Sequence, residues 1–501
     1  MSHALTPRPD ECRQYFISTP LDKLLLDQQS INPEDHILAL FHRCVAEVPA
    51  YRKFLEAQNV NPTNITTYRT FCALPLMDKA SYIYAYPLAE RCLGGSLKSS
   101  DRVAVSSGST GQPTFWPRSI ADELDVAVRF EQVFKDSFHS HERTTLTVVC
   151  FALGNWVGGL YTTSCCWHLT SKGYPLMVAT PGNNKAEIFR VIQALAPHFE
   201  QTVLLGYPPF VKDVIDSGIA EGIDWATYKP KLVFAGEVFS EEWRSLVLKR
   251  IGSTSPCYDS ASLYGTADGG VLGNETPLSI AIRRWFSVHP EAARNLFGES
   301  RLPTMVQYDP ASRFFELHDD TLVVSGENSV PLLRYHIADK GGLVSFEDMW
   351  AFLNNHGVHS LAELGLDNSS QTRSLPFVFV FGRADFTVSY YGANIYPENV
   401  TVGLEQPEFT SWISGKFVLE TRETDNSDKY LHIAVELLPA IQATIKLSEK
   451  IAESVKTQLL RLNSEFANYT PAERQLPQIT LYSFADSDYF PVGVKHRYTR
   501  N

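Results

Sequence analysis

The segment Ser106–Thr114, which reads SSGSTGQPT, has the residue types of a loop that binds a polyphosphate. Its glycines let backbone N–H groups approach an anion closely, and its hydroxyl groups add donors that carry no fixed charge. The apolar run 102–105 before it predicts a buried strand, and ligands commonly bind beyond strand ends in open α/β sheets. The segment is not a Walker A motif, because Gln112 stands where a lysine would be expected. Taken alone, the composition also fits an ordinary turn.

Further short motifs follow this segment along the chain. They are AGE at 235–237, YGTAD at 264–268, RYHIAD at 334–339, FGRADFTVSYYGANIYPENV at 381–400, and the basic triplet KHR at 495–497. Each motif is weak by itself, but their order and spacing carry information together. The series resembles the adenylate-forming superfamily of acyl-CoA ligases, and within it the phenylacetate-CoA ligase-like branch. The segments VPAYRKFLEAQNVNP and LPLMDKASYIYAYPLAE look like the opening helices of that branch, so the resemblance covers most of the chain.

The length and the pattern of the chain predict a multidomain α/β protein. At 501 residues the chain is too long for one hydrophobic core. Strand-like runs at 145–151, 176–179, 202–205 and 232–235 are separated by helical stretches, which favours a mostly parallel sheet. The resemblance implies a large N-terminal adenylate-forming domain (1–384) with mixed or parallel sheets and helices. It also implies a small, mobile α+β C-terminal lid domain (385–501) with its hinge at Asp385.

The chemistry implied by the resemblance needs ATP, Mg²⁺ and CoA. A carboxylate is joined to the α-phosphate of ATP, pyrophosphate leaves, and the thiol of CoA then attacks the acyl-adenylate. Residues at the positions of the family's phosphate loop would hold the β- and γ-phosphates: Ser106, Ser107, Gly108, Ser109, Thr110 and Gly111. Asp268 stands where most relatives have a glutamate that helps to hold Mg²⁺, so the oxygen donor is kept but its reach is shorter by one methylene.

The remaining motifs supply the other expected contacts with the nucleotide. Gly236 and Glu237 match the stretch that flanks the base, and Asp339 matches the carboxylate that accepts both ribose hydroxyls, with a turn cap as its alternative. Arg383 matches a residue near the hinge that contacts ribose or phosphate and counts with the catalytic residues, and an inter-domain salt bridge is its alternative. The strand end that borders the adenine and the acyl pocket is expected at Tyr264, Gly265 and Thr266.

Lys495 is the expected catalytic cation of the C-terminal domain. It would neutralise charge as the carboxylate approaches the α-phosphate. Its spacing to the following arginine differs from the family's pattern, and basic tails are often only solvated. Gly392 would leave room for the pantetheine arm of CoA, because any side chain there would narrow the passage.

The acid is less well defined than the chemistry. Phe151, Trp156 and Tyr161 favour a pocket for an aryl or other apolar acid, although aromatic residues in such a segment can equally be core. A fatty acid or a biosynthetic intermediate stays open. Three alternatives for the function also stay open. The acceptor can be the phosphopantetheine of a carrier protein, the acyl-adenylate can be released, or the protein can be non-catalytic and bind the nucleotide or the adenylate.

Composition and charge exclude several other functions. Lys and Arg number 44 and Asp and Glu 56, and the resulting net charge of −12 disfavours binding to nucleic acid. The uncharged stretch 144–167 is interrupted by glycine and polar residues, so we expect no membrane span. Because segment 1–11 is polar and contains proline, we expect no signal peptide there. The eight cysteines contain no CxxC pair. We therefore expect a cytoplasmic protein with reduced cysteines. Some members of the resembled branch carry a structural zinc site built from cysteines, but the segment after Asp268 contains none here, so we expect no such zinc. A monomer or homodimer is expected.

Overall fold

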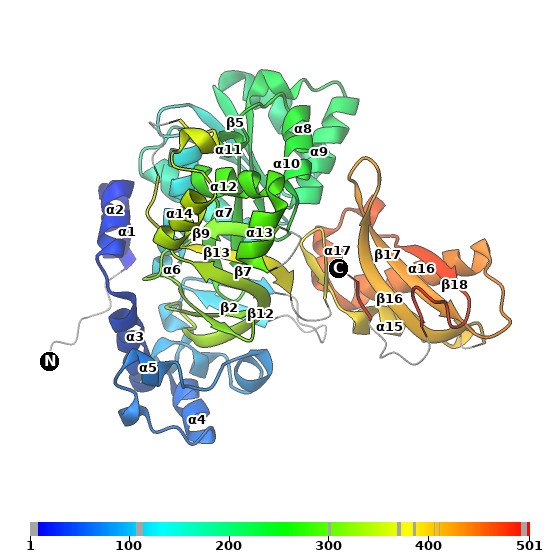
Figure 1. The fold of residues 1–501 in the computed structure, drawn as a ribbon, viewed down its shortest axis with the longest axis horizontal. Helices are drawn as coiled ribbons and strands as arrows, with labels where there is room; N and C mark the ends of the chain where they lie inside the picture. Colours follow the sequence, from blue (N-terminus) through cyan, green and yellow to red (C-terminus); the bar gives the residue numbers. More distant parts are fainter. Residues whose placement is uncertain are drawn as a thin grey trace. The chain divides into compact units, whose positions relative to one another are not determined.

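The computed structural model describes residues 9–106, 114–298, 302–367, 372–383, 387–404, 406–409, 411–491 and 498–500. The chain divides into two compact units (Figure 1). Unit 1 contains Met1–Val105, Phe115–Gly206 and Gly218–Ala384, and unit 2 contains Ser106–Thr114, Tyr207–Ser217 and Asp385–Asn501. Helices and strands alternate through most of the chain, so the expected α/β fold class is confirmed.

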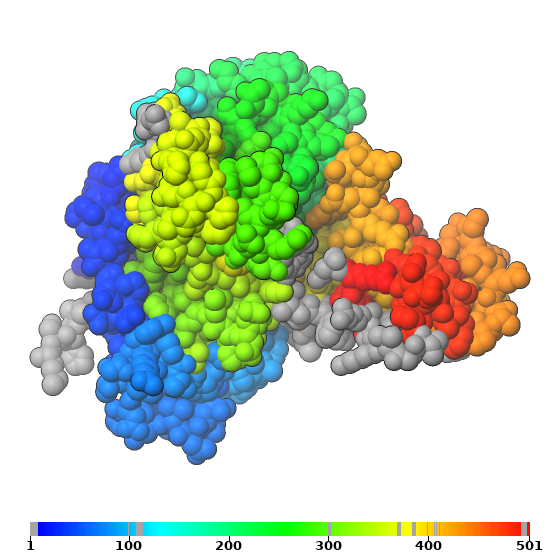
Figure 2. Space-filling model, in the orientation of Figure 1, coloured from blue at the N-terminus to red at the C-terminus, as the bar shows by residue number. Residues whose placement is uncertain are grey.

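The N-terminal part of unit 1 is helical, as the spacing of its apolar residues predicts. Pro33 opens α3 behind the cap Asn32, whose side chain accepts hydrogen bonds from the N–H groups of Glu34 and Asp35. Figure 2 shows this part as a lobe in blue on the surface of unit 1. Its helices are α1 (Pro9–Ser18), α2 (Leu21–Gln29), α3 (Pro33–Glu47), α4 (Pro49–Ala57), α5 (Tyr68–Phe71) and the π-helical turn η2 (Lys79–Ile83).

The centre of unit 1 is a sheet of 11 strands in the order β10-β11-β12-β13-β9-β8-β7-β6-β5-β3-β4. The strands are β3 (Thr145–Val149), β4 (Leu176–Ala179), β5 (Gln201–Gly206), β6 (Pro230–Ala235), β7 (Ser260–Thr266), β8 (Gly270–Asn274), β9 (Thr304–Gln307), β10 (Phe314–His318), β11 (Thr321–Gly326), β12 (Leu332–Val344) and β13 (Phe377–Arg383). Pairing is parallel from β4 to β7 and antiparallel from β7 to β10. The mostly parallel sheet that the strand-like runs predicted is therefore only one half of a mixed sheet.

Helices connect these strands and bury apolar faces in the core of unit 1. They are α6 (Ile120–Gln132), α7 (Val157–Ser171), α8 (Lys185–Leu195), α10 (Glu241–Arg250), α11 (Pro256–Asp259), α12 (Pro277–Val288), α13 (Pro290–Phe297) and α14 (Phe346–Asn355). The strands β1 (Arg102–Ser106) and β2 (Thr114–Arg118) form a separate pair. Helix α9 (Pro208–Ala220) is divided between the two units.

Unit 2 has its own core and its own sheet. Strands β16 (Ile413–Glu423) and β17 (Lys429–Leu437) are antiparallel, and β18 (Gln478–Tyr482) joins β17 in parallel. The helix α16 (Ile445–Leu462) buries Leu447, Ile451, Val455 and Leu459 at the spacing of one helix face. The other elements are β14 (Val388–Tyr390), β15 (Ala393–Ile395), α15 (Pro397–Leu404) and α17 (Ser464–Tyr469).

Three properties expected from the composition can be compared with the structure. Within the described ranges, no helix is long and apolar enough to cross a membrane. All eight cysteines are free thiols. No group of three or more His, Cys, Asp or Glu side chains that could hold a metal ion occurs among the residues that the structure describes.

The helix α2 is held to unit 1 by charged groups. Asp22 Oδ2 accepts a hydrogen bond from Lys135 Nζ (2.9 Å), and Asp22 Oδ1 accepts one from Arg373 Nη1 (2.7 Å). Partial burial raises the pKa of Asp22, but the hydrogen bonds and charges of Lys135 and Arg373 outweigh that effect and lower the pKa to about 2. The folded-state pKa thus lies below the value of an unfolded aspartate, about 3.9.

We predict that Asp22→Asn lowers the thermal midpoint at pH 5 and that this difference shrinks as the pH falls to 2.5. A carboxylate with a lowered folded-state pKa stabilises the protein fully above the unfolded pKa, and the stabilisation is lost as the pH falls toward the folded value. Asp27→Asn is the control for an exposed aspartate: Asp27 accepts hydrogen bonds from Lys23 and Tyr15, which are both exposed, and surface pairs contribute little, so its smaller effect should also change less with pH. A difference between wild type and Asp22→Asn that does not change with pH would contradict the assignment.

Candidate active site

Two tyrosine–aspartate hydrogen bonds join the motifs at 264–268 and 334–339. Tyr264 Oη on β7 donates to Asp339 Oδ2 on β12 at 2.7 Å, and Tyr335 Oη on β12 donates to Asp268 Oδ2 at 2.6 Å. Asp268 is 6% exposed and Asp339 is 8% exposed. The sheet order places β8, β9 and β13 between β7 and β12, so side chains rather than adjacent strands bring the two motifs together.

Lys79 lies beside this pair of motifs and was not singled out by its sequence. Met77 exchanges backbone hydrogen bonds with β12, donating to Arg334 O (3.0 Å) and accepting from His336 N–H (2.8 Å). Two residues later, Lys79 Nζ lies 3.8 Å from Asp268 Oδ2. The sequence around Lys79 predicts only a helix and gives this lysine no role, so it is the pairing of Met77 with β12 that reveals its place.

The turn that carries Asp268 is tightly built. Gly269 N–H donates to Thr266 Oγ1 at 2.9 Å, which closes the turn after β7. A Cβ atom added at Gly265 would lie 2.7 Å from Gly270 O, so this position in YGTAD requires glycine. Arg118 Nη2 donates to the carbonyl oxygens of Ala267 and Asp268, both at 2.7 Å.

The motif on β12 contains backbone strain. Arg334 has φ of 51° and Ala338 has φ of 60°, a region that residues other than glycine seldom adopt. Asp339 is paired in register with Arg383 on β13, and the register shifts between Lys340 and Gly341. The side chain of Arg383 is not among the described atoms. Strained backbone and bulges of this kind gather at functional sites.

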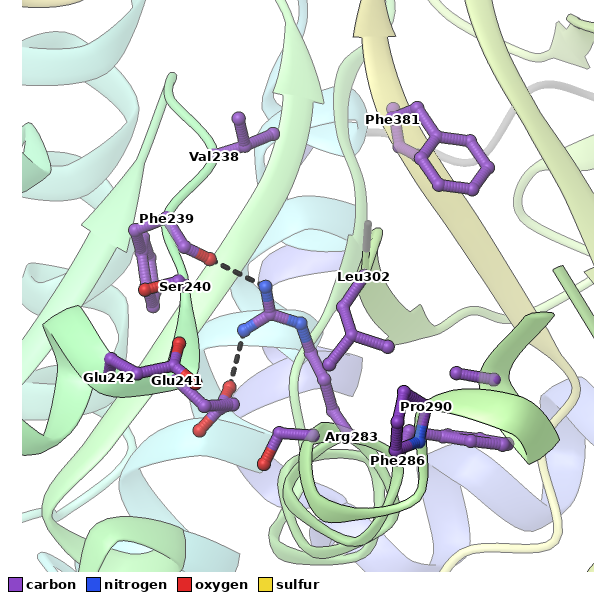
Figure 3. A pocket seen from close by; sticks show the side chains of 13 residues that line it. Val238, Phe239, Ser240, Glu241, Glu242, Arg283, Phe286, Pro290, Leu302 and Phe381 are labelled. Atoms are coloured by element: carbon purple, nitrogen blue, oxygen red, sulfur yellow. Dashed lines mark hydrogen bonds and ion pairs between the residues drawn. The ribbon is translucent and has the colours of Figure 1, made fainter. Parts of the chain in front are cut away.

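A pocket of about 410 Å³ opens next to the motif at 235–237. Gly236 follows β6 with φ of +87°, and Glu237 is buried. Figure 3 shows Phe381 across the pocket from Phe239, with Arg283 between them at depth. The lining residues are Val238, Phe239, Ser240, Glu241, Glu242, Arg283, Phe286, Ser287, Pro290, Ala293, Leu302, Val380 and Phe381.

The buried charged groups in this pocket, Arg283 and Glu241, are already paired, whereas Glu242 is exposed. Arg283 Nη2 donates to Phe239 O (2.5 Å), Arg283 Nε donates to Pro303 O (2.7 Å), and Arg283 Nη1 contacts the Glu241 carboxylate. Burial raises the pKa of Glu241, but the charges of Arg244, Arg283 and Arg284 outweigh it and lower the pKa, so this carboxylate stays ionised. The walls that face the opening are therefore mainly aromatic and aliphatic.

The aromatic residues expected in an acid pocket lie in different environments. Phe151 and Tyr161 are buried at 1% and 5% exposure, and Tyr161 Oη has no hydrogen-bond partner within the described residues. Trp156 is half-buried at the start of α7 and forms a bridge with Val105, next to the end of β1. The sequence interpretation as a pocket and its alternative as core both stay predictions.

Several expected residues fall at the borders of the described ranges. Ser106 is the buried last residue of β1, whereas Ser107, Gly108, Ser109, Thr110, Gly111, Asp385 and Lys495 lie outside the described residues.

Gly392 has φ of +81°, and a Cβ atom there would lie 2.2 Å from Tyr207 Cε1. The tight turn and the neighbouring ring are sufficient reasons for glycine at this position, apart from any passage for a thiol.

No family model matches the chain, and no curated protein matches its sequence. Among solved structures, 2-hydroxyisobutyryl-CoA ligase in complex with 2-HIB-AMP and CoA, in the thioesterification state, is similar to it with a TM-score of 0.65 and 13% identity, over 100% of this chain and 94% of that chain. The open conformation of the same ligase with 2-HIB-AMP and CoA has a TM-score of 0.52 at 13% identity, over 100% and 97% of the two chains. At this identity the similarity establishes the fold alone, and that fold is the one implied by the resemblance to adenylate-forming enzymes.

We predict that Tyr335→Phe destabilises the protein by about 1.5–3 kcal/mol, because it removes a hydrogen bond to a buried carboxylate without removing the ring. Tyr82→Phe is the matched control. Tyr82 is fully buried and its Oη has no hydrogen-bond partner among the described residues, so the change should cost less than about 0.5 kcal/mol. Urea denaturation followed by circular dichroism measures both, and equal losses would show that Tyr335 acts by packing alone.

Proposed function

We propose that this protein activates a carboxylic acid with ATP and then transfers the acyl group to the thiol of CoA. The single observation that carries the proposal is a pair of hydrogen bonds between two motifs. Tyr264 donates to Asp339, and Tyr335 donates to Asp268. This pair of bonds brings together the two motifs that the resemblance assigns to the ribose and to the metal. The fold shared with a CoA ligase supports the same conclusion.

In the first half-reaction, a carboxylate oxygen attacks the α-phosphorus of ATP. The bond from that phosphorus to the oxygen bridging to the β-phosphate breaks, and pyrophosphate leaves with the electron pair. No protein nucleophile takes part, so catalysis rests on positioning and on compensation of charge. In the second half-reaction, the thiol loses its proton to solvent, its sulfur attacks the acyl carbon, and AMP leaves.

Asp339 suits a contact with the ribose. Its carboxylate can accept several hydrogen bonds, and one of them comes from Tyr264 Oη. Tyr264 then holds the carboxylate in a fixed orientation toward the diol. Arg383, paired in register with Asp339, is proposed to contact the ribose or a phosphate from the neighbouring strand.

Asp268 suits Mg²⁺ held jointly with the nucleotide. This ion prefers oxygen ligands, and proteins usually hold it through one or two carboxylates together with phosphates and water. The described residues around Asp268 offer such a carboxylate and no cluster of three or more metal-binding side chains, which fits this mode rather than a cage of protein ligands. When bound, the ion would offset phosphate charge, and Tyr335 keeps the carboxylate oriented.

We propose that the base of ATP lies at the mouth of the pocket beside Gly236. The positive φ of Gly236 turns the backbone after β6, and Val238 lies at the pocket's edge with 44% of its surface exposed. A purine needs flat apolar walls, and Phe239 and Phe381 supply aromatic ones. An aryl or other apolar acid is the preferred substrate, with Phe151, Trp156 and Tyr161 as its proposed contacts.

Lysines from two parts of the chain are proposed to offset the negative charge of the phosphates and of the acid. Lys79 stands next to Asp268, and its charge can replace the one missing at Gln112 in the proposed phosphate loop. Lys495 is proposed to neutralise charge at the α-phosphate. Its segment is followed by Tyr498, whose carbonyl accepts a hydrogen bond from Leu419 N–H (2.8 Å) on β16.

The function is tested by incubating the protein with ATP, Mg²⁺ and a panel of aryl, aliphatic and hydroxy acids, with and without CoA. We expect one class of acid to release pyrophosphate and, with CoA, to give acyl-CoA and AMP detected by mass spectrometry. Asp339→Asn is the inactive control. Accumulation of acyl-AMP that CoA does not consume would refute the CoA ligase and favour a carrier protein as acceptor. Binding of ATP without turnover of any acid would leave a non-catalytic protein.

The two lysines should differ in kinetic signature. Lys79→Met should raise the KM for Mg·ATP about 10-fold, because it removes a charge near bound phosphates. Lys495→Ala should slow adenylation by about 100- to 1000-fold, the cost of losing one donor at a developing charge. Pyrophosphate exchange measures both effects, and thioester formation from supplied acyl-AMP should stay nearly unchanged in Lys495→Ala.

Lys53→Met is the control for the N-terminal region, since this lysine is 55% exposed and pairs with Glu90. An alanine variant at Lys495 that adenylates at the normal rate would remove this residue from the proposed mechanism. The same reasoning applies to Lys79 if its methionine variant keeps the wild-type KM for Mg·ATP.

A further inference from the structure

Arg118 connects the strand that follows the proposed phosphate loop to the turn that carries Asp268. It is the last residue of β2, which begins at Thr114, and its side chain is buried at 2% exposure. Its Nη2 atom donates to the carbonyl oxygens of two successive residues, Ala267 and Asp268, both at 2.7 Å. One guanidinium nitrogen therefore fixes the two peptide groups that flank the Cα atom of Asp268.

The surroundings of Arg118 indicate that its main polar contact is with this turn. Its Cζ atom lies 5.9 Å from the ring centroid of Trp116 and 6.0 Å from that of Tyr161. Within the described residues, no carboxylate forms an ion pair with it, and its Nε and Nη1 atoms have no hydrogen-bond partner. A buried cation without a carboxylate costs free energy, and an apolar side chain could fill the same space without that cost.

The side chain and the backbone of Asp268 are thus held from different directions. Tyr335 Oη fixes the carboxylate at Oδ2, while Arg118 fixes the carbonyl group of the same residue. Arginine suits this role because its planar fork keeps its orientation, whereas a lysine ammonium on a flexible stem does not. A carboxylate that must meet a metal and a phosphate within a narrow geometry gains from both restraints.

We propose that Arg118 is a positioning residue that sets the orientation of Asp268 for Mg²⁺ and nucleotide phosphates. The inference rests on the proposed function for its catalytic consequence, whereas the hold on the turn is independent of any activity. It deepens the site, because neither the sequence motifs nor the resemblance assigned a role to this arginine.

The test compares Arg118→Met and Arg118→Lys with Arg129→Met. Arg129 is a matched control: it is 3% exposed, its Nε and Nη1 atoms also have no partner among the described residues, and its Nη2 atom donates to Gln28 Oε1 (2.9 Å), away from the turn. Two quantities are measured. One is the Mg²⁺ concentration that gives half-maximal pyrophosphate exchange, and the other is amide hydrogen exchange of the peptide covering 264–270.

We expect Arg118→Met to raise the half-maximal Mg²⁺ concentration about 10-fold or more and to speed amide exchange in the turn, in line with the loss of charge-assisted hydrogen bonds. Arg118→Lys should recover part of both effects, and it serves as the test variant if the methionine variant does not fold. Arg129→Met should change neither quantity. An unchanged Mg²⁺ dependence, or unchanged exchange in the turn, would overturn the proposal.

A third arm asks whether Arg118 acts through Asp268. In an Asp268→Asn background, Arg118→Met should add less than about a threefold change in the half-maximal Mg²⁺ concentration, because residues that act as a unit are not additive. A full additional effect would overturn the proposal. If the wild-type protein exchanges no pyrophosphate with any acid, the proposed function fails by itself. Amide exchange in 264–270 then still decides whether Arg118 holds the turn.

Discussion

The reciprocal hydrogen bonds between two tyrosines and two aspartates are the constraint on which the rest of the site depends. The pentapeptides YGTAD and YHIAD, at 264–268 and 335–339, both place a tyrosine four residues before an aspartate. In the structure the tyrosine of each donates to the aspartate of the other. Two carboxylates that are less than a tenth exposed would be costly without such donors. The same bonds fix the separation of the two groups, so a stabilising contact also sets the geometry of the site.

These hydrogen bonds explain the backbone strain in β12. Arg334 and Ala338 adopt positive φ angles just before Tyr335 and Asp339, and each such residue costs about 1–3 kcal/mol. An unstrained strand would alternate its side chains regularly between the two faces of the sheet. The local departure from that pattern lets Tyr335 contact Asp268, which follows β7, and lets Asp339 contact Tyr264 on β7. Arg334 repays part of the cost, because its Nε atom binds Glu316 at 3.1–3.2 Å.

Much of the fold could be predicted from the sequence, because local signals dominate it. The strands near 102, 145, 176, 202 and 232 follow from their apolar runs, and α3 follows from its cap and its spacing. The antiparallel half of the sheet could not be predicted, since pairing of β12 with β13 and β13 with β9 depends on distant segments. The motif residues Tyr264, Asp268 and Asp339 were found by pattern. Tyr335 lay inside a motif without an assigned role. Lys79 lay in a segment that suggested only the opening helices, and Arg118 belonged to no motif, because the importance of both arises from tertiary contacts.

Charge explains why distant segments had to contribute. The chain carries a net charge of −12, so the field of the whole protein repels a polyphosphate, and local cations must overcome that repulsion. The phosphate-loop segment itself contains no lysine or arginine. Lys79 brings a charge from the N-terminal helical region to 3.8 Å from Asp268, and Arg118 brings a second from the strand that follows the loop. Both reach the turn after β7, where Asp268 alone would add to the repulsion. In the proposed site, where Asp268 is the metal ligand and the phosphate loop is neutral, cations from the surrounding fold therefore add to the charge of Mg²⁺ in attracting ATP.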